Sequence, residues 1–187
     1  MSAYRPQFEA ALRMLARASK TMRKGGLSAP VLVGGGAVEL YSSSAIATGD
    51  MDIATPWQEE FEAALREQGF VRPSGAGQLT RGWVHPELAM GFEVVSATLL
   101  DGEAERARVR LIDFGSDGTL EVMAVEDIIA DRMGQYASGS AHDMLRQAQA
   151  LFRLHPDADL DYLDRRIRKE TCNDFGLEAL QTDLDRV

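Results

Sequence analysis

Two aspartates separated by one apolar residue, Asp50-Met51-Asp52, constrain this chain more than any other feature. The apolar residues at Met51 and Ile53 predict a strand that enters the core. Residues i and i+2 of a strand point to the same face, roughly 6–7 Å apart. Two carboxylates at that separation repel each other unless a cation lies between them. Hard cations such as Mg²⁺ bind carboxylate oxygens and keep waters and phosphates as further ligands. The pair therefore predicts a metal site, and the alternative is a surface turn.

A run of three glycines, Gly34, Gly35 and Gly36, follows the short apolar stretch at residues 30–33. Bare backbone, together with the N–H groups at the start of a following helix, can approach a phosphate group. The alternative is a crowded strand-to-helix turn in which glycine only tolerates the backbone angles. The run is not followed by Gly-Lys-Ser/Thr and does not have the G-x-G-x-x-G spacing of dinucleotide-binding turns.

A third acid, Glu93, lies between apolar residues in Gly91-Phe92-Glu93-Val94-Val95. A half-buried carboxylate is costly unless it is paired or bound to a metal. Glu93 is therefore expected to be paired or bound to a metal. The alternative for Glu93 is that it faces solvent on the open side of the sheet.

Hydrophobic periodicity and turn residues predict alternating helices and strands, followed by helices alone. Residues 6–24 are expected to form a helix, and Thr55 is expected to cap a second one that has Pro56 at its first position and closes at Gly69. Strands are expected at residues 30–33, 51–54, 78–85, 90–97, 109–114 and 119–122, with 78–85 and 90–97 as a hairpin and 119–122 as an edge. Helices are expected at 125–137 and 140–154, with two more in 159–187.

The composition is that of an ordinary globular protein, with a net charge of −9 that opposes non-specific binding to polyanions. No apolar stretch approaches the roughly 20 residues that span a bilayer, and no signal peptide is evident, so we expect a cytoplasmic protein without membrane partners. The single cysteine, Cys172, excludes an internal disulfide. A composition shift predicts two parts, an α/β core at residues 1–122 and a helical segment at 123–187.

One part of the sequence resembles the signature of the DNA polymerase β-like nucleotidyltransferase superfamily. This part consists of the glycine run, thirteen intervening residues and then the acid-apolar-acid pattern of residues 50–52. Thr48, two residues before Asp50, matches the Thr-x-Asp-x-Asp form of its small bacterial members, and the chain looks closest to the AbiEii-type and related minimal enzymes. The resemblance implies a mixed, twisted sheet with helices mainly on one face, followed by a C-terminal helical segment. Two departures are Ile46, where many relatives have arginine, and Ala37, where serine usually follows the glycine.

The resemblance also implies roles for individual residues. Members of the superfamily carry a third carboxylate on a neighbouring strand, and this role would fall to Glu93, with Asp113 as the rival. Asp50, Asp52 and Glu93 would bind two Mg²⁺ ions, with Glu93 also acting as general base. Residues 34–36 would cradle the triphosphate together with Thr48. In the tail, Arg132 stands where lysine is usual and would neutralise triphosphate charge. Asp143 either joins this site or caps its helix, and the neighbouring His142 contacts substrate or is a surface residue.

The implied activity is transfer of a nucleoside monophosphate from ATP or another NTP to an acceptor hydroxyl. An RNA end, a protein side chain or a small molecule are the acceptors considered, and the chain would be the toxin of a toxin–antitoxin pair with an antitoxin partner. The alternative is a catalytically inactive nucleotide-binding or partner-binding module with the same fold. A third hypothesis is a toxin-neutralising protein with an apolar surface on residues 125–154.

Overall fold

The computed structural model describes residues 3–73, 82–139 and 141–182, which divide into two compact units, Met1–Met123 and Ala124–Val187. The division lies next to the composition shift in the sequence. The first unit contains α1 (Pro6–Lys24), β1 (Val31–Val33), α2 (Gly34–Tyr41), β2 (Asp50–Ala54), α3 (Gln58–Glu67), β3 (Trp83–His85), β4 (Met90–Ser96), β5 (Arg110–Asp113) and β6 (Thr119–Val122). The second contains α4 (Val125–Ala137), α5 (Met144–Leu154), α6 (Leu160–Glu170) and α7 (Glu178–Gln181).

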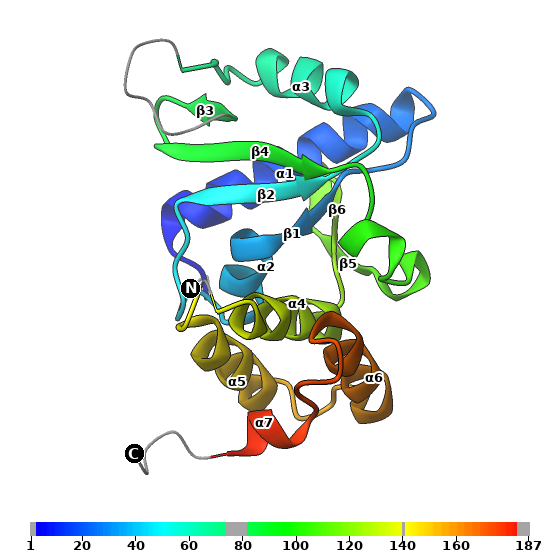
Figure 1. Ribbon diagram of the computed structural model, residues 1–187. Coiled ribbons are helices and arrows are strands. Elements are labelled where there is room, and N and C mark those ends of the chain that lie inside the picture. The colour runs from blue at the N-terminus through cyan, green and yellow to red at the C-terminus, as the bar shows by residue number, and fades with distance from the viewer. Residues whose placement is uncertain (1–2, 74–81, 140, 183–187) are drawn as a thin grey trace. The chain divides into compact units, whose positions relative to one another are not determined.

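The first unit is built on one open, mixed sheet with the strand order β3-β4-β2-β1-β6-β5 (Figure 1). Two of its neighbouring pairs, β4 with β2 and β1 with β6, are parallel, and the other three are antiparallel. The predicted mixed α/β class is therefore confirmed. The predicted hairpin is confirmed for the described strands β3 and β4, whereas residues 78–81 lie outside the described part.

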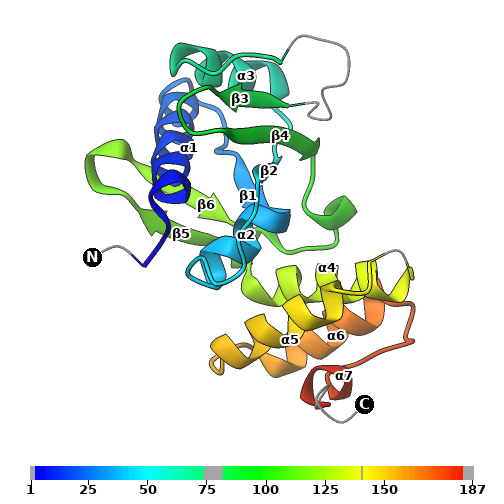
Figure 2. The same cartoon turned by 90° about the vertical axis from the view of Figure 1, so that its left-hand side faces the viewer.

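Helix α1 forms because its apolar residues recur at helical spacing and cover one face of the sheet. Its buried residues include Phe8, Leu12, Leu15 and Met22, and the helix packs against α3 and β6 (Figure 2). Its bounds are those predicted from the sequence. The glycine pair after Lys24 then ends the helix, with Gly26 in the left-handed conformation at φ +78.

Two details of the sequence prediction are wrong. Helix α3 begins at Gln58, so Thr55 does not cap it; the Thr55 hydroxyl instead accepts a hydrogen bond from the N–H of Trp57 at 3.2 Å. Strand β6 is not an edge strand, because it lies between β1 and β5. The described edge on that side of the sheet is β5, where Leu111 is 67% exposed.

The second unit is a set of helices in which α4 packs against both α5 and α6 (Figure 2). At its centre Asp127, on α4, accepts hydrogen bonds from the Nε of Arg166 at 2.8 Å and the hydroxyl of Tyr162 at 2.9 Å. Burial raises the pKa of Asp127, although both bonds act in the opposite direction. The predicted helix at 140–154 begins later, at Met144, and Ser140, its expected cap, lies outside the described residues.

Candidate functional site

The register of two neighbouring strands brings three carboxylates to one face of the sheet. Strand β2 pairs in parallel with β4, and Asp52 lies opposite Glu93. Side chains at paired positions point to the same face, and adjacent strands are about 4.8 Å apart. Asp50, two residues before Asp52 on β2, shares this face. All three residues are half-buried, whereas Met51 and Ile53 between and after them are fully buried in the core.

Asp52 also contacts the glycine run directly. Its Oδ2 accepts a hydrogen bond from the N–H of Gly35 at 2.9 Å. A Cβ atom on Gly34 would lie 2.1 Å from the same oxygen, so only glycine fits at this position, which also has a left-handed φ of +53. The glycines form the first turn of α2 instead of preceding it. The structure therefore brings Gly34–Gly36 and the acid pair into one place.

Thr48 holds the first aspartate. Its hydroxyl lies 3.3 Å from Oδ1 of Asp50 and 3.2 Å from the Asp50 carbonyl oxygen, and it can donate to one or the other. The same hydroxyl would lie 2.8 Å from a Cβ atom on Gly35. Thr48 thus fills the space between the glycine run and Asp50.

A buried ion pair fixes Thr48 in turn, and the sequence prediction missed it. Glu39, on α2, is fully buried and accepts a hydrogen bond from the Thr48 N–H at 2.6 Å. Its carboxylate binds the guanidinium of Arg5 through Nε at 2.6 Å and Nη2 at 2.9 Å, and Ser44 donates to it at 2.9 Å. Arg5 also donates to the Thr48 carbonyl oxygen. Both backbone polar groups of Thr48 are therefore held by one ion pair.

Burial by itself would raise the pKa of Glu39, but the hydrogen bonds from Arg5, Thr48 and Ser44 outweigh it and lower the pKa below the ordinary value of 4.5. Glu39 is therefore charged across the neutral range. A signal for this pair existed in the sequence, because Glu39 is the one charged residue in the apolar stretch 37–41. Its partner 34 residues away carried no such signal. The guanidinium next to Thr48 thus comes from Arg5, while position 46 holds isoleucine.

The three carboxylates offer the oxygen ligands that Mg²⁺ prefers, so the donor chemistry fits a hard divalent cation. Within the described ranges, however, no group of three or more carboxylate, histidine or cysteine side chains converges closely enough to hold a metal ion. The Asp52 carboxylate is directed to Gly35, and the Asp50 carboxylate lies beside Thr48. The strand register nevertheless places all three residues on one face of the sheet.

The rival third acid is not part of this group. Asp113 is on β5, and both β1 and β6 separate that strand from β2. Its carboxylate accepts the N–H of Gly115 at 2.8 Å, which is the geometry of a turn. Arg132 and Asp143 belong to the second unit. Asp143 is exposed and precedes α5 without a side-chain capping bond, so the predicted cap is wrong; its carboxylate accepts from Gln147 at 3.3 Å.

Arg132 is an arginine with few anionic contacts. It is only 5% exposed, and its Nε has no hydrogen-bond partner in the part of the chain that the structure describes. Its Nη1 donates to the neutral side chain of Gln135 at 3.2 Å and lies 3.8 Å from the carboxylate of Asp131. A buried guanidinium normally has a closer anion. Among the described residues, Asp131 at 3.8 Å is thus the one carboxylate within ion-pair distance of Arg132.

Comparison with known proteins adds no family assignment. Neither the family models nor the curated proteins include a match to this sequence. No helix in the described residues has the length and apolar character needed to cross a membrane.

Proposed function

We propose that this chain is a Mg²⁺-dependent nucleotidyltransferase that transfers a nucleoside monophosphate from an NTP to an acceptor hydroxyl. One observation carries the proposal: the pairing of Asp52 with Glu93, with Asp50 on the same face and the glycine run beside it. Acid-apolar-acid on one strand and a third acid on its neighbour, next to a glycine turn, is the arrangement that the resemblance implies.

Each residue of this group has a role in the proposed reaction. The half-buried Gly35 backbone at the start of α2 would approach the triphosphate, whereas Gly36 is buried against Leu32 and Met51 and would only allow α2 to pack closely on the sheet. Thr48 would orient Asp50, and Asp50, Asp52 and Glu93 would hold the divalent cations. When bound, these cations would supply positive charge at the phosphate oxygens. Glu93 would accept the proton of the attacking hydroxyl, since it is half-buried and has no hydrogen bond or ion pair among the described residues.

A non-catalytic nucleotide-binding or partner-binding module is the second candidate. The observation that favours it is the Asp52 carboxylate, which is directed to the Gly35 N–H instead of converging with Asp50 and Glu93. In that case the carboxylate only holds the glycine turn in place. The two candidates differ in one outcome, the release of pyrophosphate.

The first test is Mg²⁺-dependent pyrophosphate release from each of the four NTPs, with RNA, protein and small hydroxylated molecules as separate acceptor pools. We expect release with at least one NTP, and its loss by more than about 100-fold in Asp50→Asn, Asp52→Ala and Glu93→Gln. Even residues that only support metal ligands contribute about 10–100-fold.

Asp113→Asn is the matched control, because it removes a carboxylate from the same sheet at a strand outside the site. It should keep the full rate. Circular dichroism of each variant would check that the fold is intact. A full rate in Asp50→Asn would refute the metal-site assignment, and no release with any NTP would support the non-catalytic module.

A further inference from the structure

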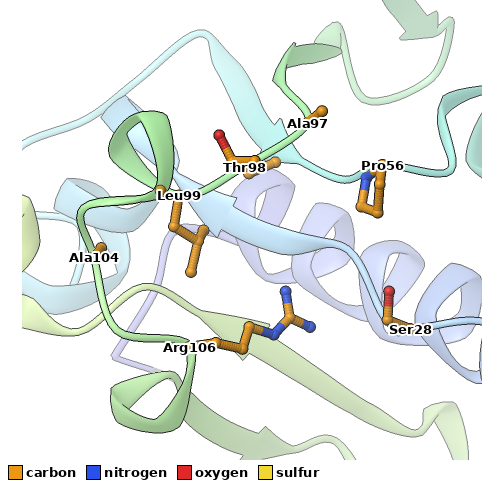
Figure 3. Close-up of a pocket in the computed structure, with 9 residues that line it drawn as sticks. Ser28, Pro56, Ala97, Thr98, Leu99, Ala104 and Arg106 are labelled. Carbon is orange, nitrogen blue, oxygen red and sulfur yellow. The ribbon is translucent and has the colours of Figure 1, made fainter.

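The first unit has a cavity of about 330 Å³ at the end of β2 opposite to the acid pair. It opens where β2 and β4 both end, and ligands of α/β sheets often bind outside the carboxyl ends of parallel strands. Its lining comes from several loops (Figure 3): Ser28, Ala54, Pro56, Ala97, Thr98, Leu99, Gly102, Ala104 and Arg106. The volume is within the range of small-molecule pockets.

The backbone around this cavity is irregular in two independent ways. The β2–β4 pairing shifts register between Ile53 and Ala54, so that Val95 of β4 bulges out and is 51% exposed. Beyond the bulge, Leu100 and Asp101 have left-handed φ values of 44 and 53 although neither is glycine. Bulges and left-handed side-chain-bearing residues are concentrated at binding sites, because such conformations persist only where the surroundings hold them.

Arg106 gives the cavity a positive charge. Its Nη2 donates to Glu121 at 2.5 Å and to the Ala29 carbonyl oxygen at 3.1 Å. The same Glu121 carboxylate also binds Arg23 at 2.8 Å, so these three side chains together carry one net positive charge. Figure 3 shows the guanidinium of Arg106 extending across the cavity toward Ser28. Among the described residues, hydrogen bonds of Arg106 involve only Nη2, so that Nε and Nη1 remain donors for a ligand.

The rest of the lining is mostly apolar. Leu99, Ala54 and Ala104 are buried and form apolar walls. The Ser28 hydroxyl accepts a hydrogen bond from Trp57 Nε1 at 3.1 Å and keeps its own proton as a donor. A positive charge, one hydroxyl donor and apolar walls are complementary to a small molecule that combines an anionic group with a compact apolar body.

From this geometry we infer that the cavity binds a small organic anion. Its carboxylate or phosphate contacts Arg106 and Ser28, and its apolar part packs against Leu99 and Ala104. This site is separate from the acid pair and does not depend on the proposed nucleotidyltransferase activity.

The test is an NMR titration of the full-length, ¹⁵N-labelled protein with benzoate, phenyl phosphate and the neutral benzyl alcohol. We expect saturable shifts in the amide signals of residues 97–104 for at least one anion, and affinity at least about tenfold weaker for benzyl alcohol. Stronger binding of benzoate or of phenyl phosphate decides between a carboxylate and a phosphate ligand. The loss of one charged hydrogen bond corresponds to about tenfold in affinity.

Arg106→Gln should weaken anion binding at least about tenfold. Arg17→Gln is the matched control. Arg17 shares the carboxylate of Asp117 with Arg13, as Arg106 shares that of Glu121 with Arg23, and the exposed fractions of the Arg17 and Arg106 side chains are similar, at 44% and 48%. Ala97→Phe, at an exposed lining position, should block binding without removing any contact of the fold. The assignment would be overturned if neither benzoate nor phenyl phosphate bound saturably. It would also be overturned if Arg17→Gln and Arg106→Gln weakened the affinity for the anion equally.

Discussion

At the scale of single residues, Glu39 determines how the first aspartate is held. The Arg5–Glu39 ion pair is linked to Thr48, and Thr48 to Asp50, by hydrogen bonds. A fully buried carboxylate is stable only with such a set of donors. Removal of Glu39 therefore affects both stability and the position of Asp50.

We expect Glu39→Gln to lower the free energy of unfolding by about 1–3 kcal/mol, because it leaves a partly buried guanidinium without its carboxylate. Urea unfolding at pH 7 measures this. Glu9→Gln is the control: its ion pair with Arg13 is an exposed i,i+4 pair, and such pairs contribute about 0.5 kcal/mol or less. Equal losses in the two variants would contradict the role assigned to Glu39.

The lowered pKa of Glu39 predicts a pH dependence with a definite sign. The folded state favours the charged form, so this stabilisation is fully present above the ordinary pKa of 4.5 and is lost as pH falls through the lower folded value. The stability difference between wild type and Glu39→Gln should therefore shrink as the pH is lowered from 6 to 3. A difference that stays constant over this range would show that Glu39 does not titrate in this way.

At the scale of elements, the junction between β1 and α2 requires glycine for two separable reasons. Gly34 has a left-handed φ of +53 and a close contact with Asp52, whereas Gly26 has a φ of +78 and nothing within 4 Å of a built Cβ. The two positions therefore share the backbone strain of a substitution but differ in the clash.

We expect Gly26→Ala to cost about 1 kcal/mol through the left-handed backbone alone. Gly34→Ala should cost about 1–3 kcal/mol more, because the new methyl group displaces the Asp52 carboxylate. Thermal unfolding of both variants gives the comparison. Equal costs would mean that Asp52 moves aside freely and is not held against the glycine turn.

Local sequence patterns predicted a helix or strand well where its bounds depend only on its own residues and their immediate neighbours. The apolar spacing of α1 and the glycine pair after it fix both of its ends, and the helix was predicted with the same bounds. Thr55 has the residue type of a helix cap, but its hydroxyl binds Trp57 and the helix starts three residues later. Strand β6 was misplaced as an edge, because its position depends on pairing with β1, far away in the sequence.

The candidate site was predictable to the same extent. The acid pair and the glycines were found from local patterns and Glu93 from the family resemblance, and the strand register places the three acids on one face. The Arg5–Glu39 pair was missed, because no sequence pattern around either residue indicates which distant residue is its partner. Long-range ion pairs of this kind are determined by the tertiary fold, which brings Arg5, before α1, next to Glu39 on α2.

At the scale of the whole molecule, each compact unit has its own buried ion cluster. The first unit has Arg5 and Glu39, and the second has Asp127 with Arg166 and Tyr162. Units with separate cores often open separately. A change to the second cluster should therefore affect the second unit first.

We expect Arg166→Met to destabilise the second unit by about 3 kcal/mol, because Asp127 is 1% exposed and loses its charged partner. Hydrogen exchange should accelerate in α4 and α6, while β1 and β2 keep their protection. Adding Asp127→Asn should restore part of the loss, since the amide oxygen still accepts from Tyr162. Equal acceleration in both units would show that the chain unfolds as one cooperative body.

The parallel pairing of β1 with β6 also bears on synthesis of the chain on the ribosome. Val31 and Leu32 pair with Glu121 and Val122, so one edge of β1 stays open until the end of the first unit has been made. At ~5–20 residues per second, that interval is roughly 5–20 s. During it, a fully apolar three-residue strand offers unpaired backbone groups to other nascent chains. Aggregation during expression would therefore begin at β1, because β6, one of its two partner strands, is made about 90 residues later.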